Sequence, residues 1–210
     1  MSKEESIGIV DYGGGNIRSL VKAVETLGGA PELITSPSGF EGVDRLLFPG
    51  QGAFGDCMRQ LRSRRLVDPL RAWIADDRPF FGICVGYQLL FEGSEESPGE
   101  AGLGVLEGLV TRFPAGPLKV PHMGWNSAAL THPEGTFWKG LGNAPYFYFV
   151  HSYFPDPRDH AVVAATTDYG LPFASAVERG SMIATQFHPE KSQRAGMRLL
   201  ANFLGAQAPA

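Results

Sequence analysis

The sequence predicts an α/β fold in which a mostly parallel central sheet carries helices on both faces, together with a small antiparallel β section. Strand-like and helix-like segments alternate over the first ninety residues, which is the pattern of a parallel sheet. The middle of the chain, residues 99–142, is richer in glycine and proline and has short β-like runs. Because 210 residues with 43% hydrophobic residues can bury one core, we expect a single domain over 6–205, with disordered or frayed tails at 1–5 and 206–210.

Hydrophobic periodicity defines the elements of the first ninety residues. Apolar residues recur at helical spacing from Ile17 until Gly28 and Gly29 end the helix. The four turn-forming positions 49–52 argue against a continuing strand. In order, the pattern predicts a strand at 7–10, a glycine-rich turn at 11–16, a helix at 17–27, strands at 31–35 and 43–48, a helical region at 56–76 broken near Asp68 and Pro69, a buried strand at 79–84 and a helix at 87–92.

The second half of the chain shows mainly β signals and ends in one helix. Ser192 is a suitable N-cap for a helix whose apolar stripe includes Leu199 and Phe203, and Gly205 would end it. The remaining pattern predicts hairpins at 105–112 and 119–130 and strands at 146–151, 161–166, 173–177 and 182–187.

Composition excludes several classes of function. The net charge of −4 leaves no basic footprint for nucleic acid or an anionic membrane, and the longest uncharged stretch, 140–155, is too short to span a bilayer. Two cysteines and a polar start, MSKEES, favour a reducing cytoplasm. Charged residues, at 19%, fall below the usual quarter, which favours a surface covered by a partner chain.

The segment Gly-Ile-Cys-Val-Gly at 82–86 has the form of a nucleophile elbow, a sharp turn between a buried strand and a helix. Glycines two positions before and after Cys84 remove the side chains that would clash at such a turn. The free amides at the start of the helix favour an anion such as a thiolate. The alternative is that Cys84 is simply a small buried hydrophobic residue.

A cysteine nucleophile needs a base held by a carboxylate, and the segment His188-Pro189-Glu190 supplies one. Residues two apart in an extended segment point to the same side, so His188 and Glu190 emerge together. An oxyanion also needs N–H donors, for which the amides of Val85, Gln51 and Gly52 are candidates. Read singly, His188 could be an ordinary histidine and 49–52 an ordinary turn.

Together, Gly82 to Gln88 and Gln-Phe-His-Pro-Glu at 186–190 resemble the motifs of class I, triad-type glutamine amidotransferases. Within that family, the segments at 11–16, 121–126 and 148–153 are similar to those of the glutaminase subunits of imidazole glycerol phosphate synthases. The resemblance covers about residues 6–204. It implies a flavodoxin-like α/β fold, and hydrolysis of L-glutamine to glutamate and ammonia, which passes to a separate (β/α)8 cyclase subunit for histidine biosynthesis. It implies no metal and no organic cofactor.

The resemblance also assigns roles to residues. It implies that Cys84 is the nucleophile, that His188 is the general base and acid, and that Glu190 supports His188. The substrate-binding residues would be Gln88, Glu96, Tyr148, His151 and Ser152, and the residues at the interface with the cyclase would be Lys191, Trp125 and Asn16. From the residues alone, Gln88 lies one helical turn after Cys84 and can face the same cleft, whereas Glu96 could equally be a solvated loop acid.

The sequence departs from the family pattern at Gln51, where valine is common. Rotation of the peptide plane in this loop depends on the backbone rather than on the side chain at position 51, so the departure does not exclude glutaminase activity. It does put in doubt the control of that activity by the partner subunit. Three other readings stay open: a class I glutaminase that feeds another synthase, a binding module with an inactive site, and a thiol hydrolase that acts on other amides.

Overall fold

The computed structural model describes residues 5–13 and 16–207, so most of the two predicted tails and part of the turn at 11–16 lie outside the described residues. The described chain forms one large sheet and two small ones. The order of the large sheet is β2 (Pro31–Ile34), β1 (Ile7–Val10), β3 (Arg45–Gly50), β4 (Phe80–Cys84), β13 (Met182–Thr185), β12 (Pro172–Arg179), β11 (Val163–Asp168) and β8 (Ala129–Leu130).

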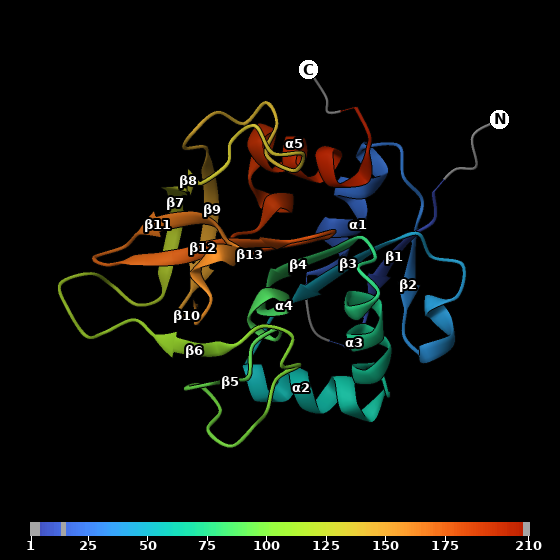
Figure 1. The fold of residues 1–210 in the computed structure, drawn as a ribbon, viewed down its shortest axis with the longest axis horizontal. Helices are drawn as coiled ribbons and strands as arrows, with labels where there is room; N and C mark the ends of the chain where they lie inside the picture. Colours follow the sequence, from blue (N-terminus) through green and yellow to red (C-terminus); the bar gives the residue numbers. More distant parts are fainter. Residues whose placement is uncertain (1–4, 14–15, 208–210) are drawn as a thin grey trace.

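The first five strands of this order are parallel, and β12, β11 and β8 extend the sheet in antiparallel fashion. Helices cover both faces: α1 (Ile17–Thr26) and α5 (Gln193–Leu204) lie on one side, and α2 (Phe54–Ser63) and α3 (Val67–Ala75) on the other (Figure 1). The predicted α/β fold class is therefore confirmed.

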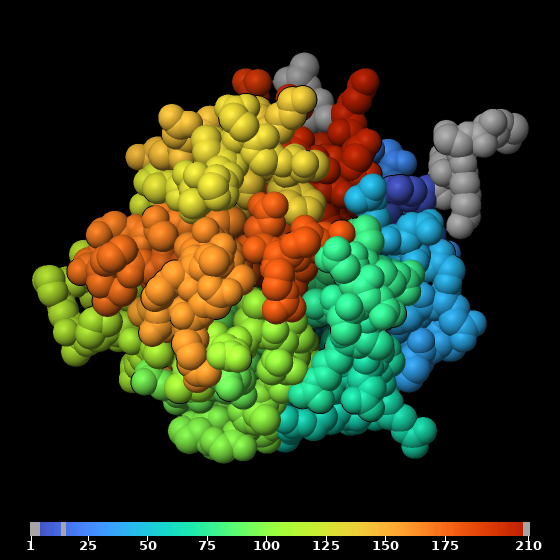
Figure 2. Space-filling model, viewed as in Figure 1, coloured from blue at the N-terminus to red at the C-terminus, as the bar shows by residue number. Residues whose placement is uncertain are grey.

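The core lies between the parallel strands and these helices. Every residue of β1, β4 and β13 is buried, as expected when both faces of a parallel strand are covered. In the space-filling view the residues of the C-terminal half, in yellow and orange, pack beside the N-terminal residues, in blue and teal (Figure 2). Among the described residues, no helix is both long and apolar enough to cross a membrane.

The two small sheets overturn the predicted hairpins at 105–112 and 119–130. In one sheet β6 (Gly108–Arg112) pairs with β5 (Gly93–Ser94) and with the distant β10 (Tyr153–Pro157). In the other, β7 (His122–Ser127) pairs antiparallel with β9 (Tyr146–His151). The strands lie close to where the pattern predicted them, but each pairs with a strand distant in sequence. Local periodicity cannot reveal such a pairing.

Several predicted boundaries were wrong for identifiable reasons. The helical region breaks at Arg65, which has φ +58°, whereas Asp68 and Pro69 lie inside the first turn of α3, where proline is tolerated. Strand β3 continues through Pro49 to Gly50 beside β4. Its pairing with β1 has already ended at Leu47, so the missing N–H of Pro49 costs nothing on that side.

The predicted helix at 87–92 is instead α4 (Val85–Gln88), which begins directly after Cys84. Gly205 ends α5 in the left-handed region, at φ +66°, which confirms that prediction. Ser192 lies at the N-cap position without capping α5, because its hydroxyl is bonded elsewhere. The described part of the chain also contains three short 3₁₀ helices: η1 (Pro37–Phe40), η2 (His160–Val162) and η3 (Pro189–Lys191).

Candidate active site

Cys84 occupies a strained turn between β4 and α4. Its φ of +55° and ψ of −112° lie outside the regions that L-residues normally adopt, which is the conformation of a nucleophile elbow. A Cβ on Gly86 would lie 1.9 Å from the carbonyl oxygen of Phe48. Position 86 therefore admits only glycine without rearrangement of the backbone, and the elbow depends on it.

Sheet topology explains why the segment 186–190 meets Cys84. Strands β4 and β13 are parallel neighbours, with Thr185 opposite Ile83, so both strands end at the same edge of the sheet. Ligand sites in α/β sheets form at that edge. His188 is fixed there by its backbone N–H, which donates to the carbonyl oxygen of Tyr148 at 3.0 Å. Residues a hundred positions apart in sequence are thus brought together.

Cys84, His188 and Glu190 form a buried cluster. The Nδ1–H of His188 donates to Oε1 of Glu190 at 2.8 Å, and both side chains are almost fully buried. This bond leaves Nε2 of His188 free for a second partner, and Cys84 and His188 line the same cavity. The order thiol, imidazole, carboxylate is the arrangement that activates a cysteine nucleophile.

The electrostatics of this cluster favour a charged imidazole. Burial lowers the pKa of His188, but the charge and hydrogen bond of Cys84, followed by those of Glu190, outweigh it and raise the pKa to about 10. Such a shift at a cleft is typical of a functional site. The arrangement therefore favours a protonated His188 at neutral pH.

A cavity of about 270 Å³ opens over Cys84. Its size suits a small ligand rather than a polymer. Ten of the site residues predicted from the sequence, or from its resemblance to the family, line this cavity: Gln51, Gly52, Cys84, Val85, Gln88, Glu96, His151, Ser152, His188 and Lys191. Glu190 lies behind His188, away from the lining.

The loop after β3 places two candidate oxyanion donors at the cavity. The carbonyl oxygen of Gln51 accepts a bond from the buried thiol of Cys57 at 3.5 Å. In a trans peptide the C=O and N–H point in opposite directions, so the N–H of Gly52 points away from Cys57. Gly52 has φ +106°, a region that favours glycine. Val85 begins α4, where N–H groups lack partners within the helix.

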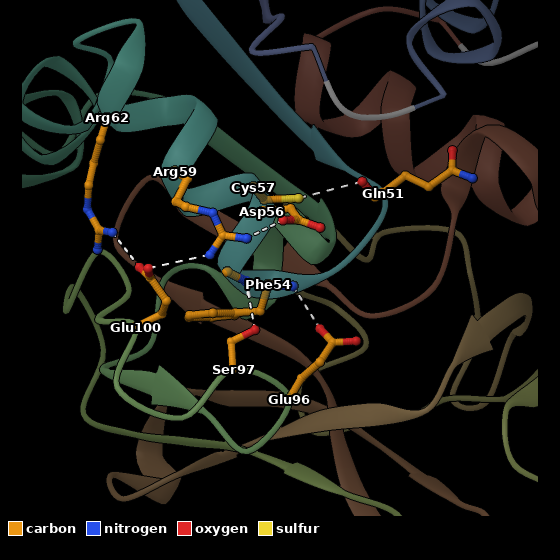
Figure 3. A network of polar contacts seen from close by, with 10 residues as sticks. Gln51, Phe54, Asp56, Cys57, Arg59, Arg62, Glu96, Ser97 and Glu100 are labelled. Carbon is orange, nitrogen blue, oxygen red and sulfur yellow. Dashed lines mark hydrogen bonds and ion pairs between the residues drawn. The ribbon is translucent and has the colours of Figure 1, made fainter.

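Glu96 has two functions in the structure. One carboxylate oxygen, Oε2, accepts from the backbone N–H of Phe54 at 2.7 Å, and Ser97 accepts from the N–H of Gly55 at 3.0 Å. Figure 3 shows both residues capping the start of α2, close to the loop that carries Gln51. Glu96 also lines the cavity. The same side chain therefore contacts both the start of α2 and the cavity.

The junction of β9 and β10 forms the other wall of the cavity. Val150, His151, Ser152 and Tyr153 line it, whereas the predicted Tyr148 is not part of the lining. The two nitrogens of the His151 ring are already bonded: Nδ1–H donates to the carbonyl oxygen of Tyr153 at 2.8 Å, and Nε2 lies 3.0 Å from Nδ1 of His122. His151 therefore has no free nitrogen for a ligand in this arrangement.

The His122–His151 pair is neutral. A carbonyl only accepts, so Tyr153 fixes the tautomer of His151, whose Nε2 must accept from Nδ1–H of His122. Nε2 of His122 then accepts from Nδ2 of Asn126 at 3.3 Å. Burial lowers the pKa of His122 to about 4 and is also the main reason that the pKa of His151 falls to about 3.

This pair predicts that the protein loses stability in mild acid. Below pH 6.5 the unfolded chain binds protons at both histidines while the folded chain does not, so stability falls as pH drops from 6.5 towards 4 and 3. We expect a loss on the order of 2 kcal/mol per histidine between pH 7 and pH 5. Urea unfolding at the two pH values measures it, and His122→Asn should show a smaller difference; an equal difference in both proteins would contradict the assignment.

The three predicted interface residues differ in setting. Trp125 is 46% exposed on β7 and its ring lies 6.2 Å from that of Tyr148. Lys191 lines the cavity from η3, and its ammonium forms no ion pair with a described residue. Asn16 precedes α1, and its Oδ1 accepts from the hydroxyl of Ser19 at 3.1 Å.

Sequence reasoning missed two residues that organise the site. Gln186 is fully buried between Cys84 and Gln88. The hydroxyl of Ser192 donates to the carbonyl oxygen of His188 at 2.6 Å and accepts from the N–H of Tyr148 at 2.9 Å. Gln186 had a signal, since it stands two residues before His188 in an extended segment and so shares its side. The role of Ser192 depends on a distant strand and had none.

Comparison with known proteins agrees with this arrangement. The sequence model "Glutamine amidotransferase class-I" matches residues 8–206. The chain is 49% identical, over 95% of both chains, to "Imidazole glycerol phosphate synthase subunit HisH" of Methylococcus capsulatus, and 46% identical to the protein of that name from Microcystis aeruginosa, over 94% of both. A solved structure entitled "Crystal structure of glutamine amidotransferase" has a TM-score of 0.74 at 23% identity, covering 95% of this chain and 97% of its own; it shows likeness of fold.

Proposed function

The chain belongs to the class I glutamine amidotransferases, and we propose that within this family it is the glutaminase subunit of imidazole glycerol phosphate synthase in histidine biosynthesis. The observation that carries the proposal is the buried cluster of Cys84, His188 and Glu190 at one cavity. The relatives named above support the choice of synthase, since each spans nearly the whole chain. We propose residues 6–205 as the catalytic domain and the cytoplasm as its location.

In the first half of the reaction the thiolate of Cys84 attacks the side-chain amide carbon of L-glutamine. A tetrahedral oxyanion forms, and the N–H groups of Val85 and of the Gln51–Gly52 loop stabilise it. The imidazolium of His188 then gives its proton to the leaving nitrogen, so that ammonia departs and a glutamyl thioester remains on Cys84. Glu190 holds the imidazole in place and offsets its charge.

In the second half, water hydrolyses the thioester. His188, now neutral, takes a proton from the attacking water, and the tetrahedral intermediate collapses to glutamate with Cys84 as the leaving group. The proton returns the site to its starting state. No redox step and no external acceptor is needed, and atoms and charges balance over the two halves.

The cavity offers partners for the charged end of glutamine. The carboxylate of Glu96 suits the α-ammonium group, and the Ser152 hydroxyl is available as a donor. Gln88 presents an amide to the same space, and His151 contributes to the wall although both its ring nitrogens are already bonded. We propose Glu96, Ser152 and Gln88 as the residues that bind the substrate, while His151 shapes the cavity and Tyr148 supports the strand beside it.

The partner would dock on the outer face of the β7–β9 pair. Alternation along these strands buries Phe147, Phe149 and His151 on the inner side, while Met123, Trp125 and Tyr146 remain 62%, 46% and 61% exposed. Large exposed apolar side chains that cluster together mark interaction surfaces. This surface, together with Lys191 and Asn16, is proposed to bind a (β/α)8 cyclase subunit that receives ammonia directly, before water protonates it.

Replacing Trp125 by alanine tests this docking surface. Because Trp125 is half exposed and at the proposed interface, its removal should weaken binding of the cyclase subunit by about 10-fold or more while the melting temperature stays unchanged. Calorimetric titration of the two subunits measures the affinity. Leu33→Ala removes an apolar side chain that is 49% exposed on β2 and should leave the affinity as it was; equal effects of the two variants would place the interface elsewhere.

Ammonia release decides the proposed function. The purified chain should hydrolyse glutamine weakly alone and faster when the cyclase subunit and its ribonucleotide substrate are present. Activity with asparagine or peptide amides in place of glutamine would indicate a different thiol hydrolase. Binding of the cyclase without any ammonia release would indicate a binding module and reject the enzyme.

A further inference from the structure

Gln186 is a buried amide in the active site that the reaction described above does not use. It has no exposed surface and follows β13, and its backbone N–H donates to the carbonyl oxygen of Ser175 at 2.8 Å. Its side-chain Nε2 donates towards Sγ of Cys84 at 3.8 Å, and its Oε1 accepts from Nε2 of Gln88 at 3.1 Å. One amide thus joins the nucleophile to a residue that lines the cavity.

The orientation of both amides follows from a single carbonyl group. The oxygen of Tyr153 can only accept, and it lies 2.9 Å from Nε2 of Gln88. The second N–H of that nitrogen points to Gln186, which must therefore present its oxygen to Gln88. The nitrogen of Gln186 is then the atom that faces Cys84. A flipped Gln186 amide would leave two nitrogens facing each other.

The first consequence concerns Gln88. Both its N–H groups are used, and its Oε1 has no partner among the described residues. Because Gln88 lines the cavity, the group available to a ligand there is an acceptor. The side-chain amide of glutamine carries N–H donors, whereas the side-chain carboxylate of the product glutamate carries none, so an acceptor that meets this end of the ligand favours glutamine over its product.

The second consequence concerns Cys84. The N–H of Gln186 approaches the sulfur at 3.8 Å, and His188 lines the same cavity. Gln186 is shielded from water, so no solvent donor competes for that position. A donor to a sulfur anion stabilises it and limits the directions in which the thiol can turn.

We propose that Gln186 is a positioning residue for glutamine hydrolysis, which orients the sulfur of Cys84 with its nitrogen and the amide of Gln88 with its oxygen. This inference rests on the proposed function. The two roles use different atoms of one side chain, so two substitutions separate them.

The test compares steady-state glutamine hydrolysis by the two-subunit complex containing Gln186→Glu or Gln186→Met. Glutamate keeps an acceptor for Gln88 but loses the donor to Cys84, so kcat should fall about 10-fold or more while KM changes little. Methionine fills the same space and loses both bonds, so kcat should fall similarly and KM should rise several-fold as Gln88 loses its orientation. This split between kcat and KM would not follow from a purely structural role.

Ser175→Ala is the matched control. Ser175 is fully buried on β12, its carbonyl contacts the backbone of Gln186, and its hydroxyl has no partner among the described residues. Its removal should leave kcat and KM within about twofold of the unmodified complex, since no bond of the site is lost. Melting temperatures of all variants separate altered chemistry from altered folding.

Two results would overturn the inference. Gln186→Glu with unchanged kcat would remove any role for the N–H at Cys84, and a loss in Ser175→Ala equal to that of Gln186→Met would assign the effect to packing. If the unmodified complex releases no ammonia, the proposed function itself fails. If it is active and the Gln186 variants match it, only the inference about Gln186 fails.

Discussion

Replacing Cys84 by alanine should abolish glutamine hydrolysis, with a fall in kcat of about 10⁴-fold or more. The thiol supplies the bond that splits the reaction into two steps, and none of the described side chains at the cavity offers a second thiol. The same substitution should abolish covalent labelling by a glutamine-like electrophile such as a diazo-oxo-norleucine. Ammonia release and mass spectrometry of the labelled protein measure the two outcomes.

Cys57→Ala provides the control for labelling. Cys57 is buried on α2 and lies outside the lining of the cavity, so removing its thiol should leave the label on position 84. A label that persists in Cys84→Ala and disappears in Cys57→Ala would contradict the assignment of the nucleophile.

Replacing Gly86 by alanine should have the second largest effect, on folding as well as on activity. The added Cβ would lie 1.9 Å from the carbonyl oxygen of Phe48 and 3.0 Å from its carbon. Both atoms belong to the backbone of β3, which is held in the sheet, so neither can move cheaply. We expect a loss of about 3 kcal/mol or more in the free energy of unfolding, measured by urea titration.

Gly116→Ala is the comparison for this substitution. A Cβ at Gly116 meets nothing within 4 Å, and its φ is not in the left-handed region, so its stability should remain within about 0.5 kcal/mol of the original. Equal stability of the two variants would mean that the elbow does not approach β3 as closely as described.

Much of the fold was predictable because its signals are local. The helix from Ile17 and its glycine stop, the apolar runs of β1 and β4, and Gly205 at the end of α5 each depend on residues within a few positions. The parallel arrangement followed from alternation of these elements.

The pairing of the middle strands was not predictable in the same way. Residues 105–112 and 119–130 suggested hairpins, but β6 pairs with β5 and β10, and β7 pairs with β9. The hydrophobic pattern of each strand indicates which of its two faces is buried, but it does not indicate which other strand pairs with it. The end of β3 at Gly50 was missed for a related reason, since the cost of Pro49 depends on where its neighbour β1 stops.

The site residues likewise fall into those that local motifs identified and those whose roles depend on distant strands. Cys84, His188 and Glu190 were identified from motifs whose spacing reflects local geometry, an elbow in one case and an extended tripeptide in the other. Ser192 and His122 act through Tyr148 and His151, on a strand distant in sequence, so no local signal indicated these roles. Their importance became visible only with the pairing of β7 and β9.

The mechanism requires a protonated imidazole at His188 next to the nucleophile, and an NMR titration of His188 measures that protonation state. We expect an imidazole that remains protonated through neutral pH, with a pKa of about 10 that falls when Cys84 is replaced by alanine. The stability that this raised pKa contributes should be complete below pH 6.5 and disappear as pH rises towards 10. Titration of His188 near pH 6.5 in both proteins would mean that Cys84 does not stabilise the charged imidazole.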